Sequence, residues 1–366
     1  MKIVNIGTQY DAYGENLKVF DTLPVQTYIV VYGERTGFHL EKYTDITAGE
    51  PKIYGAHLSK VNKVMNTYQK TERNLGVILS GAKGIGKTLF AKLLSNKAIE
   101  EGLPVIIVDR YIPGIASYIE SIDQRVMVLF DEFEKTFAKA DKTEPMVETL
   151  PLFDGIGGGN KLFVVTCNDI YNMNDYLINR PGRFHYHFRF DYPSKEEIVE
   201  YLQDKLKKDY WDQINEVVNF SSKVELNYDC LRAIAFEINE GEDFKSAIQD
   251  LNILNLRSES YEVTVVFENG EVFTDRNQFD LFSEADDDVE ASNKFGEIDI
   301  DFCPIKGVYN PDMGCVVYKP EDLVITERIS YESDEDATAW HEKMDKAKVK
   351  YMALKKIGGK KYHYAV

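Results

Sequence analysis

Short apolar runs and amphipathic segments alternate through the middle of the chain. Four runs, at residues 76–80, 105–108, 126–130 and 162–166, have the length and composition of buried strands, and helical spacing follows several of them. Strands that alternate with helices are typical of a parallel sheet with helices on both faces. The pattern therefore predicts an α/β core over residues 51–192.

Different patterns flank this core. Residues 1–50 are rich in β-branched and aromatic positions and predict a small β-rich N-terminal module. Residues 193–255 have helical spacing and predict a helical domain. Residues 256–366 return to strands, with a hairpin expected at the Asn-Gly turn of residues 269–270, and the lysines near the end predict a terminal basic helix.

Composition narrows the class of protein. The 366 residues are 44% hydrophobic, which suits two or three domains with buried cores. The net charge of -18 disfavours broad contact with nucleic acid, although a local basic channel stays open. Four scattered cysteines, no signal peptide and no apolar run of the roughly 20 residues that a membrane span needs favour the cytoplasm.

A glycine-rich loop follows the strand at residues 76–80. Its sequence is Gly81-Ala82-Lys83-Gly84-Ile85-Gly86-Lys87-Thr88, which matches G-x-x-x-x-G-K-[ST] between an apolar strand and a helix. In such a loop, backbone N–H groups and the helix N-terminus face phosphate oxygens. We expect the whole loop and Leu89 to bind ATP, with Lys87 on the β- and γ-phosphates and Thr88 on Mg²⁺.

Two later strands end in polar residues that suit phosphate chemistry. The strand at 126–130 ends in Asp131 and Glu132, at the edge of a parallel sheet where ligands bind. We expect Asp131 to hold Mg²⁺ through water and Glu132 to polarise the attacking water. Asn168 follows the next strand and can contact the γ-phosphate and the water. ATP and Mg²⁺ are therefore the expected cofactors.

Arg180 and Arg183 follow, separated by a stiff Pro-Gly pair. Arginine makes planar, bidentate contacts with phosphate oxygens. Because the phosphate loop is complete without them, we interpret both as arginine fingers that act in the site of a neighbouring subunit. The alternative is a structural ion pair.

In this order the chain carries GAKGIGKT, VMVLFDE, VVTCND and INRPGRF, and this series resembles the AAA family of AAA+ ATPases over about residues 51–254. It is similar to the clade that carries R-P-G-R. The resemblance implies an AAA+ P-loop parallel sheet core with a helical lid, here with β-rich additions at both ends. It also implies a homo-oligomer, usually a hexameric ring, with ATP at the subunit interfaces. The compact core and unusual flanks would suit a phage-encoded member acting in the host cytoplasm.

The resemblance implies three further roles. Tyr54 and Gly55 match the segment that packs against adenine. Arg232 matches a phosphate-sensing arginine of the lid. Tyr111 matches the aromatic residue of a pore loop that grips a translocating chain, although Pro113 departs from the family pattern.

Three functions fit these observations. The first is a ring-shaped motor that remodels or threads a protein substrate. The second is a nucleic-acid machine such as a helicase loader or clamp loader, and the third is an ATP-controlled assembly switch. Stimulation of ATP hydrolysis by unfolded protein, by DNA or by neither would separate them.

Overall fold

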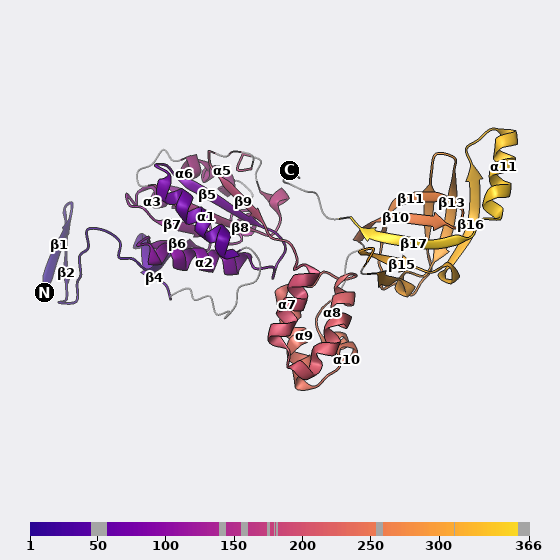
Figure 1. Ribbon diagram of the computed structural model, residues 1–366. Coiled ribbons are helices and arrows are strands. Elements are labelled where there is room, and N and C mark those ends of the chain that lie inside the picture. The colour runs from indigo at the N-terminus through magenta and orange to yellow at the C-terminus, as the bar shows by residue number, and fades with distance from the viewer. Residues whose placement is uncertain are drawn as a thin grey trace. The chain divides into compact units, whose positions relative to one another are not determined.

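A computed structural model describes residues 1–44, 57–138, 144–154, 160–173, 176–178, 180, 182–253, 259–310 and 312–357. The chain divides into two units (Figure 1). The first comprises Met1–Glu197 with Asn227–Asp229, and the second comprises Ile198–Leu226 with Cys230–Val366.

A sheet of seven strands forms the centre of the described part of the first unit. Its strands are β3 (Thr27–Gly33), β4 (Gly37–Lys42), β5 (Leu75–Ser80), β6 (Val105–Val108), β7 (Met127–Phe130), β8 (Leu162–Cys167) and β9 (Tyr186–Arg189). The order across the sheet is β4-β3-β6-β7-β8-β5-β9, and every neighbouring pair is parallel except β3 with β4. As a result, β8 lies between β5 and β7, so the ends of these three strands meet at one edge.

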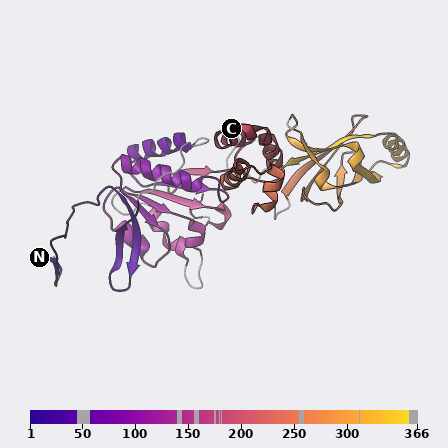
Figure 2. The same ribbon diagram turned by 90° about the horizontal axis from the view of Figure 1, so that it is seen from below.

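Helices cover both faces of this sheet (Figure 2). The helices of the first unit are α1 (His57–Lys70), α2 (Lys87–Glu100), α3 (Ile115–Glu120), α4 (Phe133–Thr136), α5 (Pro145–Glu148) and α6 (Leu150–Asp154). Val77 and Leu79 of β5 pack in one apolar cluster with α1 and α2, whereas Ile78 packs in a second cluster with α3 to α6. Burial on both faces explains the continuous apolar runs. The predicted α/β sheet is confirmed, and it has the fold of a P-loop NTPase.

The expectation of a separate module over residues 1–50 was wrong in part. Strand β3 runs parallel to β6, with Thr27 opposite Val105, and β4 pairs with β3, so both strands extend the central sheet. Tyr28 and Val30 of β3 are buried in the same cluster as α3. Local patterns cannot reveal this pairing because its partner lies about eighty residues away in the chain. Within the described residues 1–44, β1 (Lys2–Ile6) and β2 (Gln9–Tyr13) form a separate two-stranded sheet.

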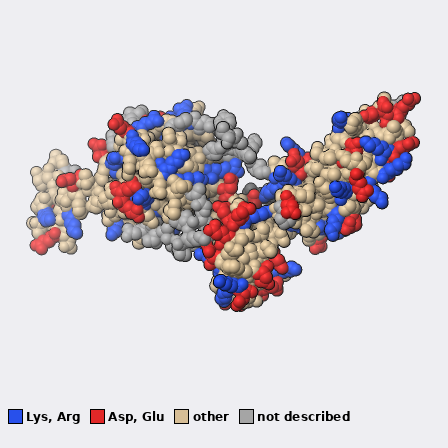
Figure 3. Space-filling model, viewed as in Figure 1, with Lys and Arg blue, Asp and Glu red and all other residues tan. Residues whose placement is uncertain are grey.

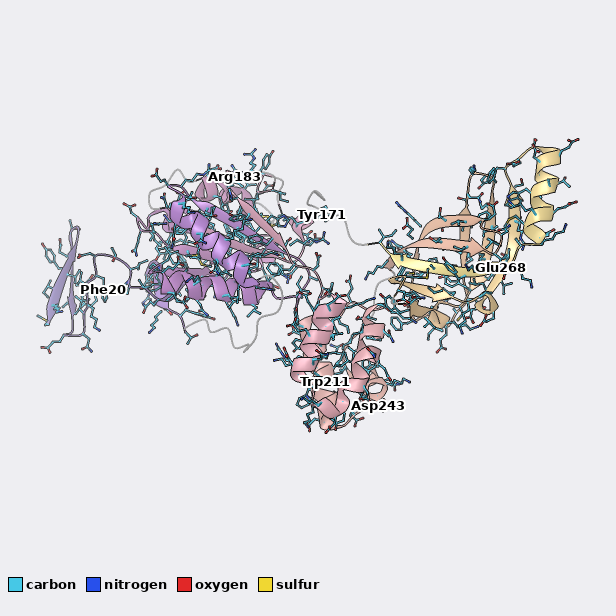
Figure 4. All side chains as sticks on the ribbon, viewed as in Figure 1. Phe20, Tyr171, Arg183, Trp211, Asp243 and Glu268 are labelled. Carbon is cyan, nitrogen blue, oxygen red and sulfur yellow. The ribbon has the colours of Figure 1, made fainter. Side chains whose placement is uncertain are left out.

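After β9 the chain forms helices in the region where the sequence has helical spacing of apolar residues. They are α7 (Lys195–Lys205), α8 (Ile214–Ser221), α9 (Tyr228–Glu240) and α10 (Phe244–Asp250). A capping box begins α7: the Ser194 N–H donates to Glu197 Oε2 (2.9 Å), and the Glu197 N–H donates to Ser194 Oγ (3.2 Å). Asp243 accepts from the N–H groups of the first turn of α10 (Figure 4).

An antiparallel sheet makes up most of the second unit after α10. Its strands are β10 (Glu259–Phe267), β11 (Val272–Phe279), β12 (Asp287–Ser292), β13 (Gly296–Phe302), β14 (Val308–Asn310), β15 (Cys315–Tyr318), β16 (Leu323–Ser330) and β17 (Val349–Lys356). The predicted hairpin at residues 269–270 joins β10 to β11. Helix α11 (Asp334–Asp345) lies between β16 and β17.

The predicted terminal basic helix was wrong for the described residues. Lys350, Lys355 and Lys356 lie in β17, which pairs with β10 on one side and β15 on the other. Burial of Met352 and Leu354 in the core of this sheet outweighs the helical preference of the lysines. None of the helices in the described ranges has the length and apolar character to cross a bilayer.

Candidate active site

The glycine-rich loop leaves β5 and enters α2 at Lys87, as the sequence predicted. Gly84 has a φ of 75° and Gly86 a φ of 99°, a backbone conformation that costs a residue with a side chain roughly 1–2 kcal/mol. These two glycines allow the tight turn that brings the loop to the first turn of α2. The first N–H groups of this helix have no acceptor within the helix and can bind an anion.

Lys87 closes over the loop. Its side chain is buried, and Nζ donates to the carbonyl oxygens of Gly81 and Ala82 (2.6 Å each) and to Asn168 Oδ1 (3.1 Å). Burial lowers the pKa of Lys87, and nearby carboxylates oppose this effect. The ammonium group is thus held at the loop by neutral oxygens, which phosphate oxygens can replace. Thr88, the next residue, is exposed.

Asp131 lies at the end of β7 beside β8. Its Oδ1 accepts a hydrogen bond from Thr166 Oγ1 (2.6 Å), and the same hydroxyl oxygen accepts from the Glu132 N–H (2.8 Å). Thr166 is buried, so both acidic residues are fixed by a rigid strand. The sequence had placed both carboxylates at this edge but had given Thr166 no role.

Glu132 has an unusual backbone. Its φ of 46° and ψ of 48° make it the one residue other than glycine with a positive φ in the described part of the chain. Such a conformation costs on the order of 1–3 kcal/mol and is typical of functional sites. The turn directs Glu132 Oε1 towards Lys135 Nζ (2.8 Å) and Asn168 Nδ2 (3.3 Å). The hydrogen bond from Lys135 lowers the pKa of the Glu132 carboxyl, which therefore stays ionised.

Asn168 is the residue at which these groups meet. Its amide oxygen accepts from Lys87, and its Nδ2 donates to Glu132 and to Glu134. The structure thus brings Lys87 of the loop together with Glu132, which follows β7, and Asn168, which follows β8. The sequence had predicted that these residues lie at one edge of the sheet. Beside them, burial raises the pKa of the Cys167 thiol to about 12, so this cysteine is inert at neutral pH.

Glu134 is a site residue that the sequence did not reveal. Its side chain is buried, and its Oε1 accepts from the backbone N–H of Asn168 (3.0 Å) and from Nδ2 (2.8 Å). The sequence shows only a second acidic residue after Glu132, which on a surface helix would face solvent. Its burial depends on the one-turn helix α4, which a local pattern of four residues does not predict.

Arg183 forms a structural ion pair, which was the alternative to an arginine finger in the sequence analysis. Its Nε and Nη2 donate to the two carboxylate oxygens of Asp154, the second at 2.7 Å, and Nη1 donates to the Tyr176 carbonyl (2.6 Å). The side chain is buried. Figure 4 labels Arg183 in the first unit. Because of this guanidinium, the pKa of the Asp154 carboxyl lies below its ordinary value. Arg183 therefore makes an ion pair within its own chain.

Arg180 has a different environment. It is exposed, and its guanidinium carbon lies 5.7 Å from the centre of the Tyr176 ring. Of the two arginines, Arg180 is the one whose charge is accessible to another molecule.

Tyr111 packs against residues of its own chain. Its ring meets Phe137 edge to face at 5.5 Å between centroids, and its hydroxyl donates to Glu148 Oε2. Burial and this hydrogen bond raise the pKa of Tyr111 to about 12. In the loop between β6 and α3, the tyrosine is thus engaged within the chain, whereas the neighbouring Arg110 side chain is 70% exposed. The role of Tyr111 in a pore loop stays a prediction.

The roles of three further residues stay predictions. Tyr54 and Gly55 lie outside the described residues. Arg232 is exposed on α9 and belongs to the second unit. Tyr228, the first residue of α9, belongs to the first unit, and its N–H donates to the Gly84 carbonyl of the loop (3.1 Å).

Comparison with known proteins concerns this same segment. A protein-family model described as Novel STAND NTPase 3 matches residues 60–219. Protein mac-1 of Caenorhabditis elegans is 26% identical over 172 residues, which cover 42% of this chain and 21% of that protein. An ATPase family AAA domain-containing protein of Arabidopsis thaliana is 27% identical over 153 residues, 36% of this chain and 13% of that protein. A proteasome-associated ATPase of Saccharomonospora viridis is 23% identical over 198 residues, 45% of this chain and 33% of that protein.

The chain covers at most a third of the length of each of these relatives, so the likeness is one of segments. The family model names an NTPase, and two of the relatives are named as ATPases. These names agree with the phosphate loop and with the carboxylates that face it. The chain thus carries an ATPase segment that resembles those of the AAA family.

Proposed function

We propose that the chain binds ATP with Mg²⁺ at the loop of residues 81–88 and hydrolyses its γ-phosphate bond. The observation that carries this proposal is the hydrogen-bonded series Lys87, Asn168 and Glu132 at the mouth of the loop. It joins a phosphate-binding cation to an ionised carboxylate through one amide. Such an arrangement suits a transfer in which positioning and electrostatic stabilisation do most of the work.

The residues present fit a magnesium ion. The exposed Thr88 hydroxyl and the Asp131 carboxylate are oxygen donors, which Mg²⁺ prefers, and Mg²⁺ keeps several waters between itself and such ligands. Bound there, the ion would neutralise charge on the phosphates. Lys87 would leave the carbonyls of Gly81 and Ala82 for the β- and γ-phosphate oxygens. Glu132 would orient the attacking water and accept its proton, with Asn168 beside it.

Two variants test this proposal. Lys87→Ala removes the cation from a loop otherwise lined by backbone, and we expect ATP affinity to fall at least tenfold, as for loss of about 1.4 kcal/mol. Glu132→Gln keeps the shape of the side chain but not its basicity, so it should bind ATP normally and hydrolyse it about a hundredfold more slowly or worse. Fluorescent-nucleotide binding and phosphate release measure the two effects. Normal turnover by Glu132→Gln would assign the role of base to another residue.

We also propose that the chain assembles into a homo-oligomeric ring, by analogy with the AAA family, in which Arg180 reaches the γ-phosphate of a neighbour. The accessible guanidinium of Arg180 supports this role, whereas Arg183 would hold the segment that carries it. An arginine finger contributes about 10³–10⁵ in rate. Specific activity should therefore rise with protein concentration.

Mixing two inactive variants tests the shared site. Arg180→Ala subunits keep the loop, and Lys87→Ala subunits keep the arginine. Each alone should be nearly inactive, and a mixture should regain turnover by pairing intact loops with intact arginines. Failure of the mixture, together with turnover that is independent of concentration, would reject the ring.

Protein is the substrate class we propose, with the helices α7 to α10 acting as the lid of the motor. The relative named as a proteasome-associated ATPase and the net charge of -18 support protein over nucleic acid. On the face drawn in Figure 3, acidic and basic side chains of the described residues are interspersed, without a continuous basic surface. Unfolded protein should stimulate hydrolysis, whereas stimulation by DNA alone would favour a nucleic-acid machine.

A further inference from the structure

Glu134 has an acidic side chain in a buried position, where such side chains are rarely found. Its side chain is 8% exposed, and its Oε2 is buried with no hydrogen-bond partner among the described residues. A buried polar atom without a partner costs about 1–3 kcal/mol, and more when it is charged. The carboxylate therefore calls for a functional explanation.

The hydrogen bonds that Glu134 accepts among the described residues come from Asn168. Its Oε1 accepts both the backbone N–H and the side-chain Nδ2 of that residue. These bonds also decide which way the amide of Asn168 points. In the observed orientation its oxygen faces the ammonium of Lys87 and its nitrogen faces the carboxylates of Glu132 and Glu134. The opposite orientation would put an acceptor against two carboxylates and a donor against an ammonium, so it is excluded.

Glu132 alone could not fix this amide as firmly. Its bond to Asn168 Nδ2 is 3.3 Å long, its side chain is 45% exposed, and it shares its Oε1 with Lys135. The bond from Nδ2 to Glu134 is 2.8 Å, and the backbone bond to Glu134 adds a second point of attachment. When phosphates draw Lys87 away from the amide oxygen, Glu134 is the group that still holds Asn168.

We propose that Glu134 is a positioning residue for ATP hydrolysis: it fixes the amide of Asn168 between Lys87 and Glu132 so that this amide can act on the γ-phosphate and the attacking water. The inference rests on the proposed function. Glu134 does not touch the nucleotide in this role, and its effect passes through Asn168.

A double-mutant cycle tests the inference. We compare the unmutated protein with Glu134→Ala, Asn168→Ala and the double variant, and measure kcat, KM for ATP, affinity for ADP and thermal unfolding. Loss of a charged hydrogen-bond partner should lower kcat by about tenfold to a hundredfold. ADP affinity should stay within about twofold, since ADP has no γ-phosphate. The double variant should be no slower than Asn168→Ala, because Glu134 acts only through that residue.

Two more variants complete the design. Glu134→Gln keeps an acceptor oxygen for Asn168 and should lose less activity than Glu134→Ala; it replaces that variant in the cycle if Glu134→Ala does not fold. Glu100→Ala, which removes an exposed carboxylate from the end of α2, is the control and should match the unmutated protein.

Three results would overturn the inference. Additive losses in the double variant would show that Glu134 acts independently of Asn168. A lower unfolding temperature with unchanged kcat in every Glu134 variant would make the residue structural only. If the unmutated protein and Glu100→Ala both fail to hydrolyse ATP, the proposed function itself falls and this inference falls with it, whereas active controls with additive losses reject Glu134 alone.

Discussion

Removing the guanidinium of Arg183 should destabilise the folded chain, because this group makes an ion pair and a backbone hydrogen bond within the first unit. The Arg183 side chain is 10% exposed and donates to both oxygens of Asp154 and to the carbonyl of Tyr176. Breaking a fully buried ion pair by deleting one partner costs about 3–5 kcal/mol. Asp154 is 37% exposed, so water can solvate its carboxylate in part, and we expect about 2–3 kcal/mol for Arg183→Ala.

Thermal and denaturant unfolding at one fixed protein concentration measure this loss. For a unit of about 200 residues, 1 kcal/mol corresponds to roughly 2–4 °C, so the midpoint should fall by about 4–12 °C. Asp154→Ala leaves the buried cation without its partner and should cost a similar amount. The double variant should cost clearly less than the sum, with a coupling of about 1–2 kcal/mol. Arg180→Ala is the matched control and should stay within about 0.5 kcal/mol of the unmutated protein.

The opposite pattern would refute the structural role of Arg183. If Arg183→Ala unfolds at the normal temperature, loses ATP hydrolysis and is rescued by mixing with Lys87→Ala, then the arginine acts on a neighbouring subunit and leaves Asp154 when the subunits assemble. Additivity in the cycle with Asp154 would point the same way.

Three further predictions follow from packing and burial. A Cβ on Gly76 would collide with the Arg183 carbonyl and come within 2.9 Å of Phe184 Cα, so Gly76→Ala should destabilise by about 1–3 kcal/mol, measured by urea unfolding; unchanged stability would contradict the close approach. Tyr111→Phe keeps the ring but loses the bond to Glu148, so stability should fall by about 1 kcal/mol while ATP affinity stays normal; lost affinity would refute the packing role. Cys167, with its raised pKa, should react with thiol reagents at pH 8 more slowly than Cys230, as peptide mass spectrometry can show; rapid labelling of the native protein would disprove its burial.

Much of the nucleotide site could be predicted from local sequence because its parts are local. The loop of residues 81–88 needs a strand before it, glycines at its turns and a helix after it, and each of these lies within a few residues in the chain. Asp131 and Asn168 could be placed with it because parallel strands expose their ends at a common edge. The hairpin predicted at residues 269–270 was likewise local and was confirmed.

Tertiary structure alone decided the partners of several side chains. That Arg183 pairs with Asp154, that Tyr111 bonds to Glu148 and that Glu134 holds Asn168 all depend on residues 29 to 37 positions apart. The pairing of β3 with β6 and of β17 with β10 spans even longer stretches. The sequence shows that a charged side chain requires an ion-pair or hydrogen-bond partner and that an apolar strand requires a neighbouring strand. It does not show which of many segments provides that partner. The choice is made only when the whole core packs, since burial and hydrogen bonding then favour one partner over all others.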